Sequence, residues 1–136
     1  MLSFKSLKTK SFLSLFLFSS MFLAQSVKAT IVQFETPFGN FEVNLYDEKA
    51  PKTVANFLSY VNDGDYSNTV FHRSVSGFIV QGGGFIYNGS MPLDTTVNKG
   101  SVRNEPVFSN VRGTIAMAKL ANDPNSASNQ WFFNLA

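Results

Sequence analysis

The chain has 136 residues, 44% of them hydrophobic, which is enough for one domain with its own core. Its formal charge is +2, but four of the 11 basic residues precede Thr30, whereas all 9 acidic residues follow it. Residues 30–136 therefore carry 7 basic and 9 acidic side chains, and this balance does not suggest a nucleic-acid partner. The absence of cysteine excludes disulfides, cysteine-linked lipid, a thiolate nucleophile and cysteine metal sites, and the single histidine argues against a histidine-rich metal site.

The segment Met1–Ala29 has the pattern of a secretory signal peptide. Three lysines occur by residue 10, Phe12–Ala24 is apolar apart from serines, and Val27-Lys28-Ala29 offers small residues where a signal peptidase cleaves. The apolar run is shorter than the roughly 20 residues that span a bilayer, although an uncleaved anchor stays open as the alternative. We expect cleavage after Ala29, a periplasmic or secreted location and no stable membrane association afterwards.

Two alternating runs follow. Val32 and Phe34 alternate with polar residues in Thr30–Thr36, and the same alternation recurs in Phe41–Tyr46. Pro37-Phe38-Gly39-Asn40 between them has the composition of a turn. This pattern predicts a β-hairpin.

Pro51–Asn62 has the pattern of an amphipathic helix. Pro51 suits the first helical position, and Gly64 is placed to end the helix. Apolar residues at helical spacing form one stripe, which we interpret as core packing: Val54, Phe57, Leu58 and Val61.

Residues 71–84 contain the only histidine, His72, followed by Arg73. Val70–Val75 reads as a short strand in which Phe71, Arg73 and Val75 share one face. A turn at Ser76-Gly77 leads into a second apolar run, Phe78–Gln81, in which Ile79 and Gln81 share a face, and three glycines follow. A planar guanidinium near aromatic rings suits recognition of an uncharged, partly apolar group that carries an acceptor. From spacing alone, a solvated strand arginine and a satisfied amide are the commoner case.

The remaining segments alternate between loops and short strands. Phe85–Gly100 has little periodicity and is predicted to be a surface loop. Asn110–Gly113 is predicted to be a turn before a short buried strand at Thr114–Ala118. Leu120–Asn129 is a polar loop, and Gln130–Leu135 is a last apolar strand.

The run F-H-R-x-x-x-G-F-x-x-Q-G-G at residues 71–83 resembles the signature of the cyclophilin-type peptidyl-prolyl isomerases. The resemblance extends to A-P-K-T-V-x-N-F-L at 50–58, N-E at 104–105, R-G-T-I-A-M-A at 112–118 and x-Q-x-F at 129–132, and so covers residues 30–136. It implies a mainly β protein: a closed antiparallel β-barrel, eight-stranded when complete, with flanking helices.

The reaction that the resemblance implies is rotation about an Xaa-Pro peptide bond, which has a barrier of about 18–20 kcal/mol and needs no nucleophile, cofactor or metal. Arg73 matches the family's catalytic arginine, and Gln81 matches the glutamine that orients the arginine and the substrate. The other matching positions line the proline pocket and the peptide groove: Phe78, Ile79, Phe132, Ala118 and Gln130. The expected partners are proline-containing peptides and unfolded exported proteins, bound by a monomer.

The sequence departs from the family pattern at several positions. Ser76 stands where the family often has proline, Trp131 replaces a usual phenylalanine, and Lys119 lies at a variable position, so drug affinity is not transferred. Cyclophilins continue with further strands and a helix beyond the position of Ala136. We therefore expect residues 30–136 to be an incomplete domain and this chain alone to be a poor enzyme.

Other classes of function stay open. A non-catalytic proline-peptide-binding or chaperone-like module would use the same barrel without accelerating rotation. A ligand-carrying barrel would bind small apolar molecules and no proline peptides. A Ser-His-Asp hydrolase would need His72 as its base, but no G-x-S-x-G motif accompanies it.

Overall fold

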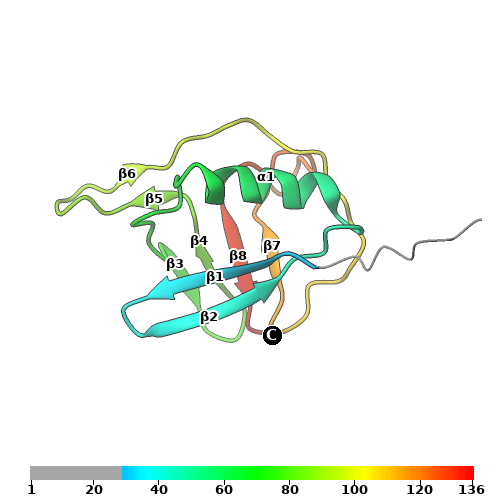
Figure 1. Ribbon diagram of the computed structural model, residues 1–136, viewed down its shortest axis with the longest axis horizontal. Helices are drawn as coiled ribbons and strands as arrows, with labels where there is room; N and C mark the ends of the chain where they lie inside the picture. The colour runs from blue at the N-terminus through cyan, green and yellow to red at the C-terminus, as the bar shows by residue number, and fades with distance from the viewer. Residues whose placement is uncertain (1–28) are drawn as a thin grey trace, which may run out of the picture.

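The computed structural model describes residues 29–136 (Figure 1), and the predicted leader up to residue 28 lies outside these described residues. In chain order the elements are β1 (Ile31–Thr36), β2 (Gly39–Asn44), α1 (Pro51–Asn62), β3 (Arg73–Val75), β4 (Ile79–Gly82), β5 (Phe85–Ile86), β6 (Asp94–Thr95), β7 (Ile115–Met117) and β8 (Trp131–Asn134). The mainly β expectation is confirmed. Within residues 29–136, α1 is too short and too polar to cross a lipid bilayer, and no other helix there could do so.

The strands form three antiparallel sheets. β1 pairs with β2 as the predicted hairpin, the strand order of the central sheet is β3-β4-β8-β7, and β5 pairs with β6. The hairpin packs across the central sheet with α1 beside both, as Figure 1 shows. In residues 29–136 these sheets are not joined into one hydrogen-bonded ring, because β1, β2, β3 and β7 are each paired on one side only. A cleft of about 350 Å³ is lined by residues of β2, α1 and β7.

Trp131 on β8 lies at the centre of the core. Its ring meets the rings of Phe34, Phe71 and Phe133 edge-on, at centroid distances of 5.2, 5.6 and 5.4 Å. Together with Trp131, the buried core cluster comprises Leu45, Val54 and Phe57. The predicted helix stripe is confirmed, since its four residues either belong to this cluster or pack against it.

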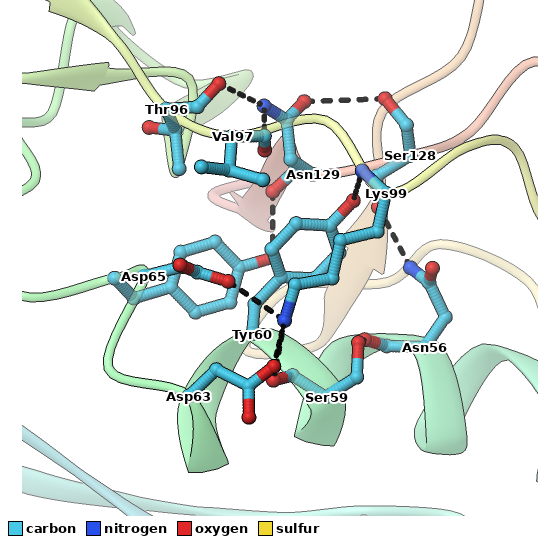
Figure 2. A network of polar contacts seen from close by, with 11 residues as sticks. Asn56, Ser59, Tyr60, Asp63, Asp65, Thr96, Val97, Lys99, Ser128 and Asn129 are labelled. Atoms are coloured by element: carbon cyan, nitrogen blue, oxygen red, sulfur yellow. Dashed lines mark hydrogen bonds and ion pairs between the residues drawn. The ribbon is translucent and has the colours of Figure 1, made fainter.

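The segment predicted to be a loop at Phe85–Gly100 contains the short pair β5 and β6, so that prediction was wrong in part. Two-residue strands are too short to leave a periodic signal. The end of the segment is also anchored: the Lys99 ammonium pairs with Asp63 and, at 2.7 Å, with Asp65 just after α1 (Figure 2). Hydrogen bonds to Asp63 and then Asp65 raise the pKa of Lys99. The Lys99 backbone N–H donates to the hydroxyl of Tyr60 at 2.8 Å, which explains how this tyrosine is fully buried.

The first turn of α1 is capped from a distant part of the chain. Ala50, the N-cap residue, provides no side-chain acceptor, and the first turn contains no acidic residue. Instead the Glu105 carboxylate accepts the backbone N–H groups of Lys52 at 3.3 Å and Thr53 at 2.8 Å, and the Thr53 hydroxyl at 2.9 Å. Partial desolvation acts to raise the pKa of Glu105, but these hydrogen bonds outweigh it and the pKa is lowered.

We expect Glu105→Ala to lower the free energy of unfolding by about 1 kcal/mol, because α1 loses its N-terminal acceptor. Glu105→Gln keeps one carbonyl oxygen and should cost less. Because folding lowers the pKa of Glu105, its ionised carboxylate stabilises the fold at pH values above the ordinary pKa of 4.5. This stabilisation is lost as the pH falls through the lowered pKa of the folded state. Urea unfolding of the native protein and Glu105→Gln should therefore give curves that converge as the solution is acidified below pH 4.5. A constant difference would contradict this cap.

Candidate active site

The central sheet aligns the predicted residues in one cross-strand row. Arg73 on β3 pairs with Gln81 on β4, Gln81 pairs with Phe132 on β8, and Phe132 pairs with Ala116 on β7. Directly paired residues project from the same face of a sheet. Strand alternation adds Ile79, Gln130 and Ala118 to that face.

The opposite face of this sheet is the one that packs on the core. Trp131 and Phe133 alternate with the row residues on β8, and both belong to the core or contact it. On β7, Met117 follows the row residue Ala116 and also packs against the core. The row therefore lies on the face turned away from the hairpin and α1, where Arg73 is exposed and Gln81, Gln130 and Phe132 are half-buried.

Three side chains of this face are joined by hydrogen bonds. The Arg73 guanidinium donates to Gln81 Oε1 at 3.3 Å, and Gln81 Nε2 donates to Gln130 Oε1 at 2.7 Å. Gln81 therefore holds one arm of the guanidinium and is itself fixed by Gln130. The other N–H groups of Arg73 remain available for a ligand, because a guanidinium has five donors.

The apolar positions differ in exposure. Ile79 is only 4% exposed, whereas Phe78 is 54% exposed at the turn between β3 and β4. The Ala118 backbone N–H donates to the Gln130 carbonyl at 2.8 Å, so these two residues lie side by side at the end of the β7–β8 pair. Six of the seven predicted residues thus share one face. Phe78 is placed by the turn instead.

Asn129, the residue before Gln130, is hydrogen-bonded to two other segments of the chain. The Tyr66 hydroxyl donates to the Asn129 carbonyl at 2.7 Å, and the Asn129 side-chain amide donates to the carbonyls of Thr96 and Val97 (Figure 2). Burial, with smaller contributions from Tyr60 and Asp65, raises the pKa of Tyr66, which keeps its hydroxyl a neutral donor. These contacts fix the backbone from which Gln130 projects.

The surroundings of His72 give no support to acid–base work in the part of the chain that the structure describes. Its Nδ1 is buried without a hydrogen bond among residues 29–136, and its ring lies 4.8 Å from the ring of Phe85. The same part of the chain contains no group of three histidine, cysteine or carboxylate side chains that could hold a metal ion.

Two residues at this site were missed from the sequence. Ala116 lies opposite Phe132, and the alternation within Thr114–Ala118 could have identified it as the neighbour of Ala118 on the same face. Gly84 packs against the Gln130 side chain. Its position in a run of three glycines gave no signal that distinguished it.

Comparison with known proteins agrees with this arrangement. The family model described as "Cyclophilin type peptidyl-prolyl cis-trans isomerase/CLD" matches residues 31–136. Peptidyl-prolyl cis-trans isomerase A of Dickeya dadantii is 44% identical over 91% of this chain and 63% of its own length. Peptidyl-prolyl cis-trans isomerase B of Escherichia coli is 41% identical over 77% and 62%. A crystal structure of a Cryptosporidium parvum cyclophilin-type isomerase, in the presence of the dipeptide Ala-Pro, covers 76% of this chain and 66% of its own, with a TM-score of 0.63 and 29% identity.

The chain spans about three-fifths of the length of these curated bacterial relatives, at 63% and 62%, and 58% of an Acinetobacter baylyi relative that is 40% identical. The family match nevertheless covers all the strands and the helix that the structure describes. The chain belongs to the cyclophilin-type peptidyl-prolyl cis-trans isomerase family.

Proposed function

We propose that this protein is a peptidyl-prolyl cis-trans isomerase that acts on exported proteins. The observation that carries the proposal is the hydrogen-bonded set Arg73–Gln81–Gln130 on a solvent-accessible sheet face, with Phe132 in the same row. That face combines an oriented cation, an amide and an aromatic ring, the groups that a prolyl peptide bond requires.

The chemistry follows from the barrier to rotation. As the Xaa-Pro amide twists, it loses resonance and the prolyl nitrogen becomes pyramidal and regains its lone pair. A guanidinium N–H of Arg73 aimed at that nitrogen forms a better hydrogen bond in the twisted state than in the planar one, and only such a difference lowers the barrier. Gln81 holds the guanidinium in this orientation without neutralising it, because an amide oxygen carries no net charge.

The rest of the face has binding roles in this proposal. The proline ring lies against Phe78, Ile79 and Phe132, whose side chains are apolar. The peptide runs along Ala118 and Gln130, whose backbones are joined by a hydrogen bond. The Cryptosporidium parvum crystal structure in the presence of the dipeptide Ala-Pro supports a proline peptide as the ligand of this fold.

The site of action rests on residues 1–29. Their lysines, apolar run and small-residue ending support export, hence a periplasmic or secreted monomer whose clients are unfolded exported proteins. In this proposal the isomerase domain begins at Thr30. Cell fractionation should find the protein outside the cytoplasm, and a purely cytoplasmic pool would contradict this part of the proposal.

Refolding kinetics provide the test of function. Prolyl isomerisation limits refolding of many chains to tens or hundreds of seconds. Small amounts of the full-length protein should shorten the proline-limited phase of a denatured client in proportion to the concentration added. Binding to proline peptides without acceleration would favour the non-catalytic module. Affinity for small apolar molecules alone would favour the ligand-carrying barrel.

A further inference from the structure

Thr30, the first residue after the predicted cleavage site, is held by hydrogen bonds on two sides. Its backbone N–H donates to Asp47 Oδ2 at 2.8 Å and its hydroxyl donates to Asp47 Oδ1 at 2.6 Å. Its carbonyl accepts the Leu45 N–H at 2.8 Å. Ala29, immediately before it, is exposed. The chain therefore becomes firmly attached to the fold at Thr30 and leaves the preceding peptide bond accessible.

Asp47 lacks a cationic partner in residues 29–136, where the ion pairs are those of Lys99. The side-chain and then the backbone hydrogen bond from Thr30 lower the pKa of Asp47. A shallow hollow beside Ala29 is lined by Tyr46, Glu48 and Lys49 as well as Asp47, so these are the titratable groups that surround the position.

We propose that Asp47 is the acceptor site for the α-ammonium group of Thr30, formed when a signal peptidase hydrolyses the Ala29–Thr30 bond. Water adds across that amide: Ala29 keeps the carboxylate, and the released Thr30 amine takes up a proton at neutral pH. An amide N–H already directed at the carboxylate is thereby replaced by a cation at the same place. Processing then converts a hydrogen bond into an ion pair that seats the new N-terminus. This inference rests on the proposed export.

The test uses protein purified after export. N-terminal sequencing should begin at Thr30. The pKa of its α-amine, measured from the pH dependence of acetylation, should lie about 1 above the ordinary 7.7–8.0, because a carboxylate in contact favours the charged amine. Asp47→Asn should return it to the ordinary range, whereas the matched neighbour variant Glu48→Gln should not.

The outcomes separate the two ideas. An intact Met1 on the exported protein would overturn the proposed cleavage after Ala29 and this inference together. A start at Thr30 whose amine pKa is the same in the parent and in Asp47→Asn would overturn only the acceptor site. Isomerase activity is not involved in either measurement.

A second and independent observation concerns Gly84. A Cβ atom at this buried glycine would lie 2.8 Å from Cδ and Nε2 and 2.9 Å from Cγ of Gln130. Its φ lies outside the left-handed region, so the backbone conformation does not favour glycine here, and the close contact with Gln130 is the reason for glycine. The Gly84 carbonyl also accepts the Thr96 N–H at 3.0 Å, which holds its backbone in place. An added methyl group would therefore displace the Gln130 side chain.

We infer that Gly84 is a positioning residue, which acts by leaving room for the Gln130 conformation that holds Gln81 against Arg73. The inference rests on the proposed isomerase function. The preceding glycines differ in this respect, because Cβ atoms at Gly82 and Gly83 would meet the rigid ring of Trp131. Substitution there would disturb the core, whereas substitution at Gly84 would act on a flexible side chain.

A double-mutant cycle tests the coupling. Gly84→Ala should lower kcat about 10-fold through misplacement of the guanidinium. Gln130→Ala should lower activity too, but adding Gly84→Ala to it should change kcat by less than about twofold, because no Gln130 side chain remains to be displaced. Full activity in Gly84→Ala, or a second full loss in the double variant, would overturn the inference.

Two further readouts keep the outcome decisive. The side-chain amide NMR signal of Gln81 should shift alike in Gly84→Ala and Gln130→Ala, whether or not the protein isomerises anything, so this inference and the proposed function can fail separately. Unfolding can be monitored by the fluorescence of Trp131, the only tryptophan in the sequence. If Gly84→Ala alone is unfolded, the double variant should be folded again. An unshifted Gln81 signal, or a double variant that stays unfolded, would overturn the inference.

Discussion

Replacing Arg73 with alanine is expected to lower kcat/KM on an Xaa-Pro peptide by on the order of 10²-fold or more, which is the usual cost of losing one preorganised donor to a transition state. Proline-peptide affinity and the thermal midpoint should change little, because Arg73 is exposed and, within residues 29–136, its guanidinium donates only to Gln81. The measurement is a peptide isomerisation assay on the full-length protein, with peptide titration alongside.

Two controls refine this prediction. Arg73→Lys should restore only part of the rate, since a point charge cannot keep the planar geometry that contacts Gln81 and a substrate together. Arg103→Ala removes a different exposed arginine outside the central sheet and should leave the rate unchanged. Parent-like turnover by Arg73→Ala would show that its assigned role is wrong.

Trp131→Ala is expected to lower the free energy of unfolding by about 3–5 kcal/mol, the range for deleting a large buried aromatic side chain. The indole is 4% exposed, and the rings of four aromatic residues meet it edge-on: Phe34, Tyr66, Phe71 and Phe133. Because a domain of this size is stable by about 5–15 kcal/mol, this single change removes a large part of the total. Urea or thermal unfolding measures it.

Trp131→Phe is the matched control. The ring conserves most of the aromatic packing, and the indole N–H that it removes is buried without a partner in residues 29–136. Phenylalanine is also the residue that the family pattern has at this position. We expect a loss of less than about 1.5 kcal/mol, as for other conservative core exchanges. Equal losses in the two variants would show that the indole nitrogen, and not the ring packing, matters.

Local patterns predicted most of the elements. Alternation identified the β1–β2 hairpin, although β1 begins one residue later than predicted and β2 begins and ends two residues earlier. Helical spacing identified α1 with its observed range, Pro51–Asn62. The strand predicted at Val70–Val75 is shorter, because its first three residues make only isolated hydrogen bonds and the ladder begins at Arg73.

In the candidate site, too, contacts within one hairpin could be predicted from local sequence patterns, whereas contacts between distant strands could not. The pairing of Arg73 with Gln81 follows from a hairpin centred on the turn at Ser76-Gly77, which the sequence shows. The approach of Gln130 to Gln81 joins residues 49 apart and depends on β4 pairing with β8, for which no local pattern exists. The family resemblance assigned both residues to the substrate site but did not predict this contact. The distant cap from Glu105 and the anchor at Lys99 are tertiary contacts of the same kind.

The most direct measurement is cis–trans exchange of a short Ala-Pro peptide, followed by NMR with the full-length protein at a small fraction of the peptide concentration. If the Arg73–Gln81 pair stabilises the twisted amide, exchange between the two isomers accelerates in proportion to the protein added, and Arg73→Ala abolishes most of the acceleration. Peptide signals that broaden or shift on binding while the exchange rate stays at its uncatalysed value would contradict the proposed function.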